Sequence, residues 1–489
     1  MKKLIVLALI LNYFSIHGQK NSKPNIIYIY ADDLGYGELG CYGQLKIKTP
    51  NVDRLASEGI RFTRHYSSAP VCAPSRCMLL TGKHPGHSYI RGNYELGGFP
   101  DSTEGGQMPL PEGTITIAKL LKNKGYKTAA IGKWGLGMNN TTGNPNAQGF
   151  DYFYGYLCQK QAHNYYPTHL WENGKWDTLD NPEINVHRKI DVTQVTDEDY
   201  EYYKGSDYAP DKMIQKALAF INQNKKNPFF LYFPSPIPHL SLQIPDRYLQ
   251  PYLGKFEEKP YLSQNGYAMH KTPSSAYAAM ITYLDAQIGL ILKKVKAEGL
   301  ENNTIIMFSS DNGATFTGGV DAAYFNSASG LRGLKMDLYE GGIRSPFIVK
   351  WPGKIRANTS TDLVSIQYDL MATLNELLGL NAPTNDGISY LPTLLGNSKM
   401  QKRRPYTYFE YPEKGGQLAI HFEQWKGVKM NMKTNKNVPW ELYDLQSDPL
   451  ETNDVASMHL DILQKLDAIV LKEHTNSHVR EWEFVNPKF

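Results

Sequence analysis

The sequence has little cysteine and little net charge, and each shortage excludes a class of protein. The 489 residues include only four cysteines, Cys41, Cys72, Cys77 and Cys158, which are too few for a disulfide scaffold and allow one bridge at most if Cys72 is modified. The formal net charge is +4, and about +2 without Lys2 and Lys3 (+4 − 2), so no strong field attracts nucleic acid or an anionic membrane. An anionic ligand therefore needs a local cluster of cationic side chains.

Long apolar runs are also scarce. Leu4–Leu11 is the apolar segment of an expected signal peptide, residues 1–18, with Lys2 and Lys3 before it and a cleavage site after Gly18. The run is shorter than the about 20 residues that span a bilayer, and we expect no membrane span after it. The sequence therefore predicts an exported protein, secreted or periplasmic. Nothing in it indicates an oligomeric state.

Residues 19–392 alternate short apolar segments with amphipathic ones, as in a mostly parallel sheet with helices on both faces. The expected strands are Ile26–Tyr30, Thr128–Ile131, Phe229–Phe233, Ile305–Phe308 and Phe347–Lys350. The expected helices are Asp53–Gly59, Ile115–Lys124, Lys212–Asn222 and Ser274–Ala297. We therefore predict an α/β fold for this domain.

The pattern changes after Pro392. Short strand-like segments follow one another and a single amphipathic helix comes after them: Tyr406–Glu410, Leu418–Phe422, Trp425–Met430, Glu441–Asp444 and the helix Leu460–Lys472. Residues 393–489 are therefore predicted to form a smaller α+β subdomain with an antiparallel sheet. The boundary is expected between about residues 380 and 405.

Polar side chains follow four of the expected strands. Asp32-Asp33, Lys133, His239 and Asp311-Asn312 each come after a different strand. Any one of them alone reads as a turn or a helix cap, but the ends of parallel strands meet at one edge, where such sheets bind ligands. The oxygen donors of Asp32, Asp33, Asp311 and Asn312 suit Ca²⁺ or Mg²⁺ better than zinc.

Cys72-Ala73-Pro74-Ser75-Arg76 has the form of a helix start. Pro74 fits the first position of a helix, and Cys72 would then lie at the N-terminal end, where backbone N–H groups favour an anion. Arg76, one turn further, can reach back toward Cys72. The alternative is a small buried cysteine that precedes a helix.

Together with Leu80-Thr81-Gly82, this segment resembles the signature of type I sulfatases, and the resemblance extends over nearly the whole mature chain. Similar motifs occur in the family's order: Asp32-Asp33-Leu-Gly-Tyr-Gly, Gly125-Tyr-Lys-Thr-Ala with Gly132-Lys133-Trp134, Pro238-His239, Ser310-Asp311-Asn312-Gly313, Arg332-Gly333-Leu-Lys335 with Tyr339-Glu340-Gly341-Gly342-Ile-Arg344, and Glu441-Leu-Tyr-Asp-Leu with Asp448-Pro449 and Glu451. The chain is similar to bacterial carbohydrate exo-sulfatases of the alkaline phosphatase superfamily.

The resemblance implies a formylglycine-dependent enzyme whose catalytic domain is residues 19–392. A formylglycine-generating maturation enzyme would oxidise Cys72, and the hydrated aldehyde would attack sulfur while Asp311 takes its proton. A divalent cation, Ca²⁺ or Mg²⁺, would be held by Asp32, Asp33, residue 72, Asp311 and Asn312. The same resemblance assigns Lys133, Lys335 and Arg76 to the sulfate, His239 with Lys335 to the leaving oxygen, and Arg332 to substrate binding.

One position departs from the family pattern, which usually has histidine where this chain has Gly135. That histidine is credited with deprotonating the second hydroxyl of the formylglycine hydrate. His163 is the first candidate to replace it as a base, and binding of the sugar is an equally good role for His163.

The substrate expectation is a sulfated carbohydrate, with galactose or N-acetylgalactosamine sulfate first. Tyrosines cluster before Trp171, and their rings suit either sugar binding or a loop that covers the core: Tyr152, Tyr154, Tyr156, Tyr165 and Tyr166. Two alternatives remain. One is a phosphonate or phosphate monoester hydrolase of the same superfamily, and the other is an inactive protein that binds sulfated glycans.

Overall fold

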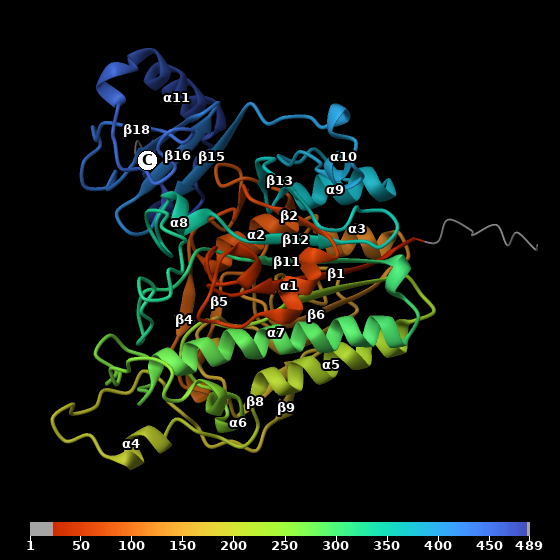
Figure 1. Ribbon diagram of the computed structural model, residues 1–489, viewed down its shortest axis with the longest axis vertical. Helices are drawn as coiled ribbons and strands as arrows, with labels where there is room; N and C mark the ends of the chain where they lie inside the picture. The colour runs from red at the N-terminus through yellow and green to blue at the C-terminus, as the bar shows by residue number, and fades with distance from the viewer. Residues whose placement is uncertain (1–22, 487–489) are drawn as a thin grey trace, which may run out of the picture.

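The computed structural model describes residues 23–486, so the predicted signal peptide lies outside the described residues. Its main element is a ten-stranded mixed sheet (Figure 1). In spatial order the strands are β13 (Thr359–Thr361), β2 (Ile60–Phe62), β12 (Phe347–Lys350), β11 (Thr304–Ser310), β1 (Asn25–Ala31), β10 (Phe229–Pro234), β6 (Lys127–Lys133), β7 (Tyr152–Tyr156), β8 (His169–Glu172) and β9 (Lys175–Thr178). All five strands predicted from the sequence are confirmed.

The centre of the sheet is parallel and its flanks are mixed. Strands β11, β1, β10, β6 and β7 run parallel to their neighbours in that group, whereas β12, β8 and β9 pair antiparallel. Because the central strands point the same way, their carboxyl ends meet at one edge. The predicted α/β fold with a mostly parallel sheet is confirmed.

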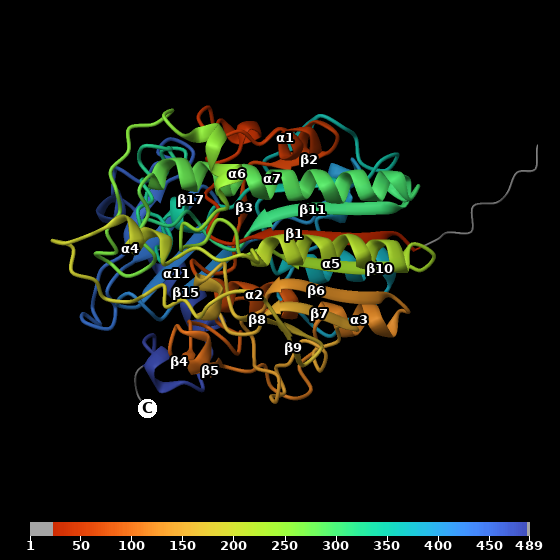
Figure 2. The same cartoon turned by 90° about the horizontal axis from the view of Figure 1, so that it is seen from below.

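Alternate residues of β1 pack against two different helix layers, as a strand buried on both faces requires. Ile27 and Ile29 belong to one apolar core, whereas Ile26, Tyr28 and Tyr30 belong to the other. The first core includes α1 (Pro50–Ser57), α5 (Ala209–Asn224) and α7 (Pro273–Ala297), and the second includes α2 (Cys72–Thr81), α3 (Ile117–Asn123) and α9 (Asp369–Leu378). Figure 2 shows α5 and α7 lying along the central strands.

Five further helices are short or peripheral: α4 (Asp197–Glu201), α6 (Asp246–Leu249), α8 (Glu340–Ile343), α10 (Leu391–Leu394) and α11 (Leu460–Glu473). Among the described residues, α7 alone is long and apolar enough to cross a membrane by length and composition. However, 78% of its most apolar window is buried inside the fold, as expected for a core helix. Two small sheets complete the domain: β3 (His65–Tyr66) with β14 (Ser365–Ile366), and the hairpin of β4 (Glu95–Gly97) and β5 (Glu104–Gln107).

A separate antiparallel sheet follows in the C-terminal region (blue in Figure 1). Its strands are β15 (Tyr406–Tyr411), β16 (Gln417–Phe422), β17 (Trp425–Lys429) and β18 (Glu441–Asp444). Helix α11 packs on this sheet through Ile462, Leu466 and Ile469. The predicted antiparallel sheet with one helix is confirmed. Tyr390 and Leu394 still pack in the core of the large sheet, so the change of sheet follows α10.

Candidate active site

The polar residues predicted at the strand ends lie together at the carboxyl edge of the large sheet. Asp32 and Asp33 directly follow β1, Asp311 directly follows β11, and Lys133 ends β6. His239 lies in the loop after β10. All five side chains are buried, so their charges must be balanced by one another or by a ligand.

Cys72 is the first residue of α2, with its side chain directed at this cluster. Its Sγ lies 3.3 Å from Asp32 Oδ1 and 3.7 Å from Lys133 Nζ. The sequence suggested Pro74 as the first residue of the helix. The helix begins two residues earlier, so Pro74 is its third residue. Burial, and after it the charge of Asp32, raises the pKa of the Cys72 thiol well above its usual value. An unmodified Cys72 is therefore a protonated thiol and a weak nucleophile.

The acidic residues and Asn312 form one hydrogen-bonded group. The Asp33 backbone N–H donates to Asp311 Oδ1 at 3.0 Å, and Asn312 Nδ2 donates to Asp33 Oδ1 at 2.8 Å. Asp33 has a φ of 64°, a left-handed conformation that is uncommon outside glycine and asparagine or aspartate. Such conformations cluster at functional sites, where the surrounding structure holds them.

Three cations neutralise the carboxylates. Arg76 is fully buried, and its Nη2 lies 2.8 Å from Asp311 Oδ2 and 3.3 Å from Asp32 Oδ2. Lys133 Nζ lies 2.7 Å from Asp32 Oδ2, and Lys335 Nζ lies 2.8 Å from Asp33 Oδ2. The guanidinium of Arg76 therefore orients the carboxylates, whereas the two ammonium groups lie nearer to residue 72 and His239.

The pKa values of Asp32 and Asp311 are shifted in opposite directions. Burial opposes ionisation of Asp32, but Lys133, His239 and Arg76 hold its pKa far below the usual value. Burial and the neighbouring charge of Asp32 raise the pKa of Asp311 to about 7. Two carboxylates with pKa values pushed apart are typical of sites that move protons.

His239 is held by a hydrogen bond on each ring nitrogen. Its Nδ1 donates to Leu240 O at 2.6 Å, and its Nε2 lies 3.1 Å from Lys335 Nζ and 3.7 Å from Asp33 Oδ2. A neutral ring with its proton on Nδ1 accepts from the Lys335 ammonium at Nε2. Tyr165 Oη donates a hydrogen bond to His239 O at 2.7 Å and so holds the loop in place.

The cluster offers carboxylate and amide oxygens to a metal ion, and the Cys72 thiol and the His239 ring lie in the same group. Ligand atoms of Asp32, Asp33, Cys72 and His239 lie within 4.8 Å of one another, and Asp311 and Asn312 are hydrogen bonded to Asp33. The Oδ1 atom of Asn312 is buried without a protein hydrogen-bond partner. A buried amide oxygen beside three carboxylates is an arrangement that a cation satisfies.

His163 lies beside this cluster and Arg332 does not. The His163 ring stacks on the His239 ring, with centroids 4.9 Å apart. Arg332 instead packs on Tyr339 and bonds to Tyr443 Oη and Glu451 O, where the large domain meets the small sheet. These bonds come from Nη1 alone and the side chain is 41% exposed, so the role of Arg332 in substrate binding stays a prediction.

The space beside Gly135 is filled by Gln159. A Cβ added to Gly135 would lie 2.9 Å from Gln159 Cγ, and Gln159 is 1% exposed. Gln159 Nε2 lies 3.5 Å from Asn93 Oδ1, which accepts a hydrogen bond from the Ala73 N–H next to Cys72. A neutral amide therefore occupies this place, and an amide is not a base.

Sequence reasoning missed the neighbours of His163. His187, Phe99 and Tyr267 surround its ring, and each comes from a different loop. No motif or spacing in the sequence marks these residues. The tyrosine-rich segment before Trp171 packs mainly inside: Tyr154, Tyr156, Tyr165 and Tyr166 are buried in the core. Of the two alternatives for this segment, the core role is the one seen for those four rings.

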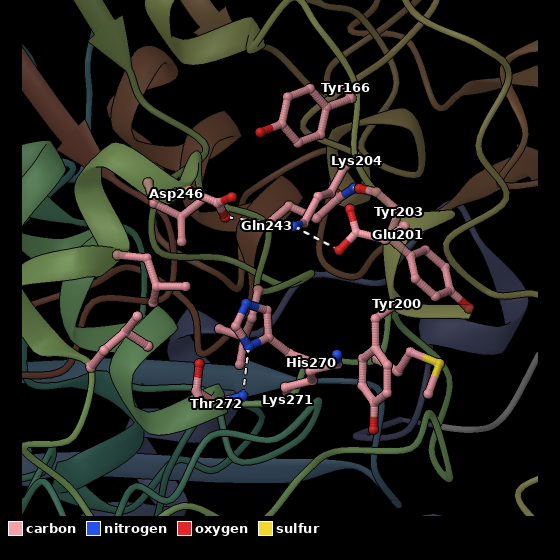
Figure 3. A pocket seen from close by; sticks show the side chains of 15 residues that line it. Tyr166, Tyr200, Glu201, Tyr203, Lys204, Gln243, Asp246, His270, Lys271 and Thr272 are labelled. Atoms are coloured by element: carbon pink, nitrogen blue, oxygen red, sulfur yellow. Dashed lines mark hydrogen bonds and ion pairs between the residues drawn. The ribbon is translucent and has the colours of Figure 1, made fainter. Parts of the chain in front are cut away.

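A separate pocket of about 220 Å³ lies near α6. Figure 3 shows its tyrosines and the ammonium of Lys204, which lies 2.9 Å from Glu201 Oε1 and 3.6 Å from Asp246 Oδ1. Tyr166 lines this pocket, whereas Cys72, the polar residues at the strand ends and His163 do not. The four cysteines, including Cys72, are all free, so the one disulfide that the sequence allows is not formed.

Comparisons with known proteins agree with this geometry. The sulfatase family model matches residues 24–380, and the model of the C-terminal region of N-sulphoglucosamine sulphohydrolase matches residues 334–475. The N-acetylgalactosamine-6-O-sulfatase of Bacteroides thetaiotaomicron is 31% identical over 93% of this chain and 94% of its own length. The N-acetylgalactosamine-6-sulfatase of Homo sapiens is 32% identical over 84% of this chain and 73% of its own length.

A solved sulfatase of glycosaminoglycan metabolism in Bacteroides thetaiotaomicron superposes with a TM-score of 0.72 and 29% identity. The match covers 92% of this chain and 99% of that one. The family match spans most of the chain and includes all the strand ends that form the cluster. The chain belongs to the sulfatase family, and it is an enzyme that hydrolyses sulfate esters.

Proposed function

We propose that the protein is an exported exo-sulfatase of sulfated glycans, with a formylglycine made from Cys72 and a bound Ca²⁺, for which Mg²⁺ is the alternative. The observation that carries the proposal is the position of Cys72: its side chain, at the N-terminus of α2, is aimed at Asp32 and Lys133. A buried neutral thiol beside carboxylates is a poor nucleophile, so the position needs the modification that the family resemblance implies.

Asp32, Asp33, Asp311, Asn312 and residue 72 would hold the cation, which supplies positive charge that orients the sulfate and stabilises charge on it. The formylglycine supplies a hydrated aldehyde as the nucleophile. A hydroxyl at residue 72 would lie close to Lys133, whose Nζ is 3.7 Å from Cys72 Sγ, and Lys133 and Lys335 would present their ammonium groups to the sulfate oxygens. Arg76 keeps the carboxylates in place, and we assign Asp311 as the acceptor of the nucleophile's proton.

The leaving oxygen needs a proton, and the Lys335–His239 pair supplies it. His239 Nδ1–H is fixed on the Leu240 carbonyl, so the ring can exchange a proton at Nε2, which is hydrogen bonded to the Lys335 ammonium at 3.1 Å. A proton held between these two nitrogens can pass to the departing alcohol. Gly135 has no side chain, so it cannot take the proton of the second hydroxyl of the formylglycine hydrate.

The substrate class follows from the relatives. Two of them are named for N-acetylgalactosamine 6-sulfate, and we propose the same class, with galactose sulfate second. Export follows from residues 1–18, and we propose a formylglycine-generating enzyme as the maturation partner.

The test is a competition between ester classes. Matured protein is given N-acetylgalactosamine 6-sulfate and the corresponding phosphate ester, and sulfate and phosphate release are measured. We expect sulfate release to exceed phosphate release by orders of magnitude. Dominant phosphate or phosphonate hydrolysis would favour the other hydrolase class, and binding of the sulfated sugar without release would favour a silent binding protein.

A further inference from the structure

The two histidines beside the site form a hydrogen-bonded pair within an aromatic cluster. His163 Nδ1 lies 2.9 Å from His187 Nε2. The Phe99 ring stacks on both, at 5.2 Å from His163 and 3.6 Å from His187. His163 thus has Phe99 and His239 as stacking neighbours, and its orientation is fixed.

A backbone group sets the proton position on His187. The Tyr267 N–H donates to His187 Nδ1 at 3.3 Å. A backbone N–H can only donate, so Nδ1 of His187 is the unprotonated nitrogen and the neutral ring has its proton on Nε2. Gly266 permits this approach: its φ is +76°, and a Cβ there would lie 2.8 Å from His187 Nδ1.

The proton position on His163 follows from that on His187. Because His187 donates from Nε2, His163 Nδ1 accepts, and the neutral His163 ring has its proton on Nε2. Burial lowers the pKa of His187 to about 4 and that of His163 well below its usual value, which agrees with two neutral rings. No hydrogen-bond partner for His163 Nε2 occurs among residues 23–486.

We propose that His163 Nε2–H is a hydrogen-bond donor to an oxygen of the sugar, and that His187 is the positioning residue that fixes this donor. The inference rests on the proposed glycan substrate and chooses between the two roles expected for His163. A ring nitrogen that already has a proton cannot accept one from the second hydroxyl of the formylglycine hydrate. The proposed function assigns the sulfate oxygens to Lys133 and Lys335, so we assign His163 to an oxygen of the sugar.

The proton position can be measured without substrate. In ¹⁵N-histidine-labelled protein, the protonated and unprotonated ring nitrogens have well-separated ¹⁵N shifts. His163→Gln and His187→Gln identify the two residues among the 13 histidines. We expect Nε2-protonated signals for both. An Nδ1-protonated His163 in the wild-type protein would overturn the proposal.

The kinetic test reverses the hydrogen bond. In His187→Glu a carboxylate accepts from His163 Nδ1, so at a pH where the ring is neutral its one proton moves from Nε2 to Nδ1 and Nε2 cannot donate. We expect KM for N-acetylgalactosamine 6-sulfate to rise about tenfold, as for one lost hydrogen bond, with kcat little changed. In the matched control His187→Gln the side-chain amide still donates, and KM should stay near the wild-type value.

A small aryl sulfate separates this inference from the proposed function. Its turnover should fall less in His187→Glu than the turnover of N-acetylgalactosamine 6-sulfate does. Equal KM changes in His187→Glu and His187→Gln, or an unchanged KM for the sugar in His163→Ala, would overturn the inference. A His163→Ala variant that releases one equivalent of alcohol and then stalls would show that His163 is the base instead. Absence of sulfate release from N-acetylgalactosamine 6-sulfate by the wild-type protein would refute the proposed function, while the ¹⁵N result would still decide the proton position.

Discussion

Gly135→Ala tests whether Gln159 fills the place where the family has a histidine. Gly135 has a φ of +76°, and an added Cβ would lie 2.9 Å from Gln159 Cγ and 3.0 Å from its Cδ. The left-handed backbone costs an alanine about 1–2 kcal/mol, and overpacking a buried contact costs about 1–3 kcal/mol more. The loss of glycine entropy in the unfolded chain offsets about 0.4–1 kcal/mol. We expect the free energy of unfolding to fall by about 2–4 kcal/mol.

Gly113→Ala is the matched control, because Gly113 has a φ of +77° and nothing within 4 Å of an added Cβ. Gly113→Ala has the backbone cost but not the packing cost, so its free energy of unfolding should fall by about 1 kcal/mol or less. Urea unfolding of both variants and of Gly135→Ala/Gln159→Ala measures the difference. The double variant should recover part of the loss. Equal destabilisation of the two single variants, or no recovery in the double one, would refute the packing of Gln159 against residue 135.

Three further predictions concern the cation and two charged groups outside the site. EDTA should abolish sulfate release and lower Tm, and Ca²⁺ should restore both; stoichiometric zinc in the purified protein would contradict the oxygen donor set. Glu340→Gln should lower the free energy of unfolding by about 3–5 kcal/mol, because the Glu340 carboxylate is fully buried 3.0 Å from the buried Lys426 ammonium. The exposed control Asp461→Asn should lower it by less than about 1 kcal/mol. Similar losses in the two variants would refute the claim that burial makes the Glu340 ion pair the more important one. Burial lowers the pKa of His474, but its hydrogen bond to Glu410 outweighs this and the net pKa is raised. That stabilisation is complete below about pH 6.5 and is lost as pH rises through the raised pKa, so the stability gap between wild type and His474→Gln should shrink from about pH 6 to pH 9, and a constant gap would contradict it.

The fold and the centre of the site follow from local patterns. Asp32, Lys133 and Asp311 could be placed together because each directly follows or ends a parallel strand, and such strands end at one edge. The residues around His163 could not, because their loops have no periodicity and only tertiary packing brings Phe99 and His187 into contact. Arg332 belongs to the same sequence motif as Lys335, but its side chain contacts Tyr339 and Tyr443 and not the strand-end cluster. A motif alone did not reveal this difference.

Sulfate release by the matured wild-type protein and by Cys72→Ala tests the central claim most directly. Both proteins are incubated with N-acetylgalactosamine 6-sulfate, and free sulfate is measured while Tm and circular dichroism check the fold. Alanine cannot become formylglycine, so turnover should fall to background while the fold and sugar binding persist. Near-wild-type sulfate release by Cys72→Ala would contradict the assignment of residue 72 as the nucleophile.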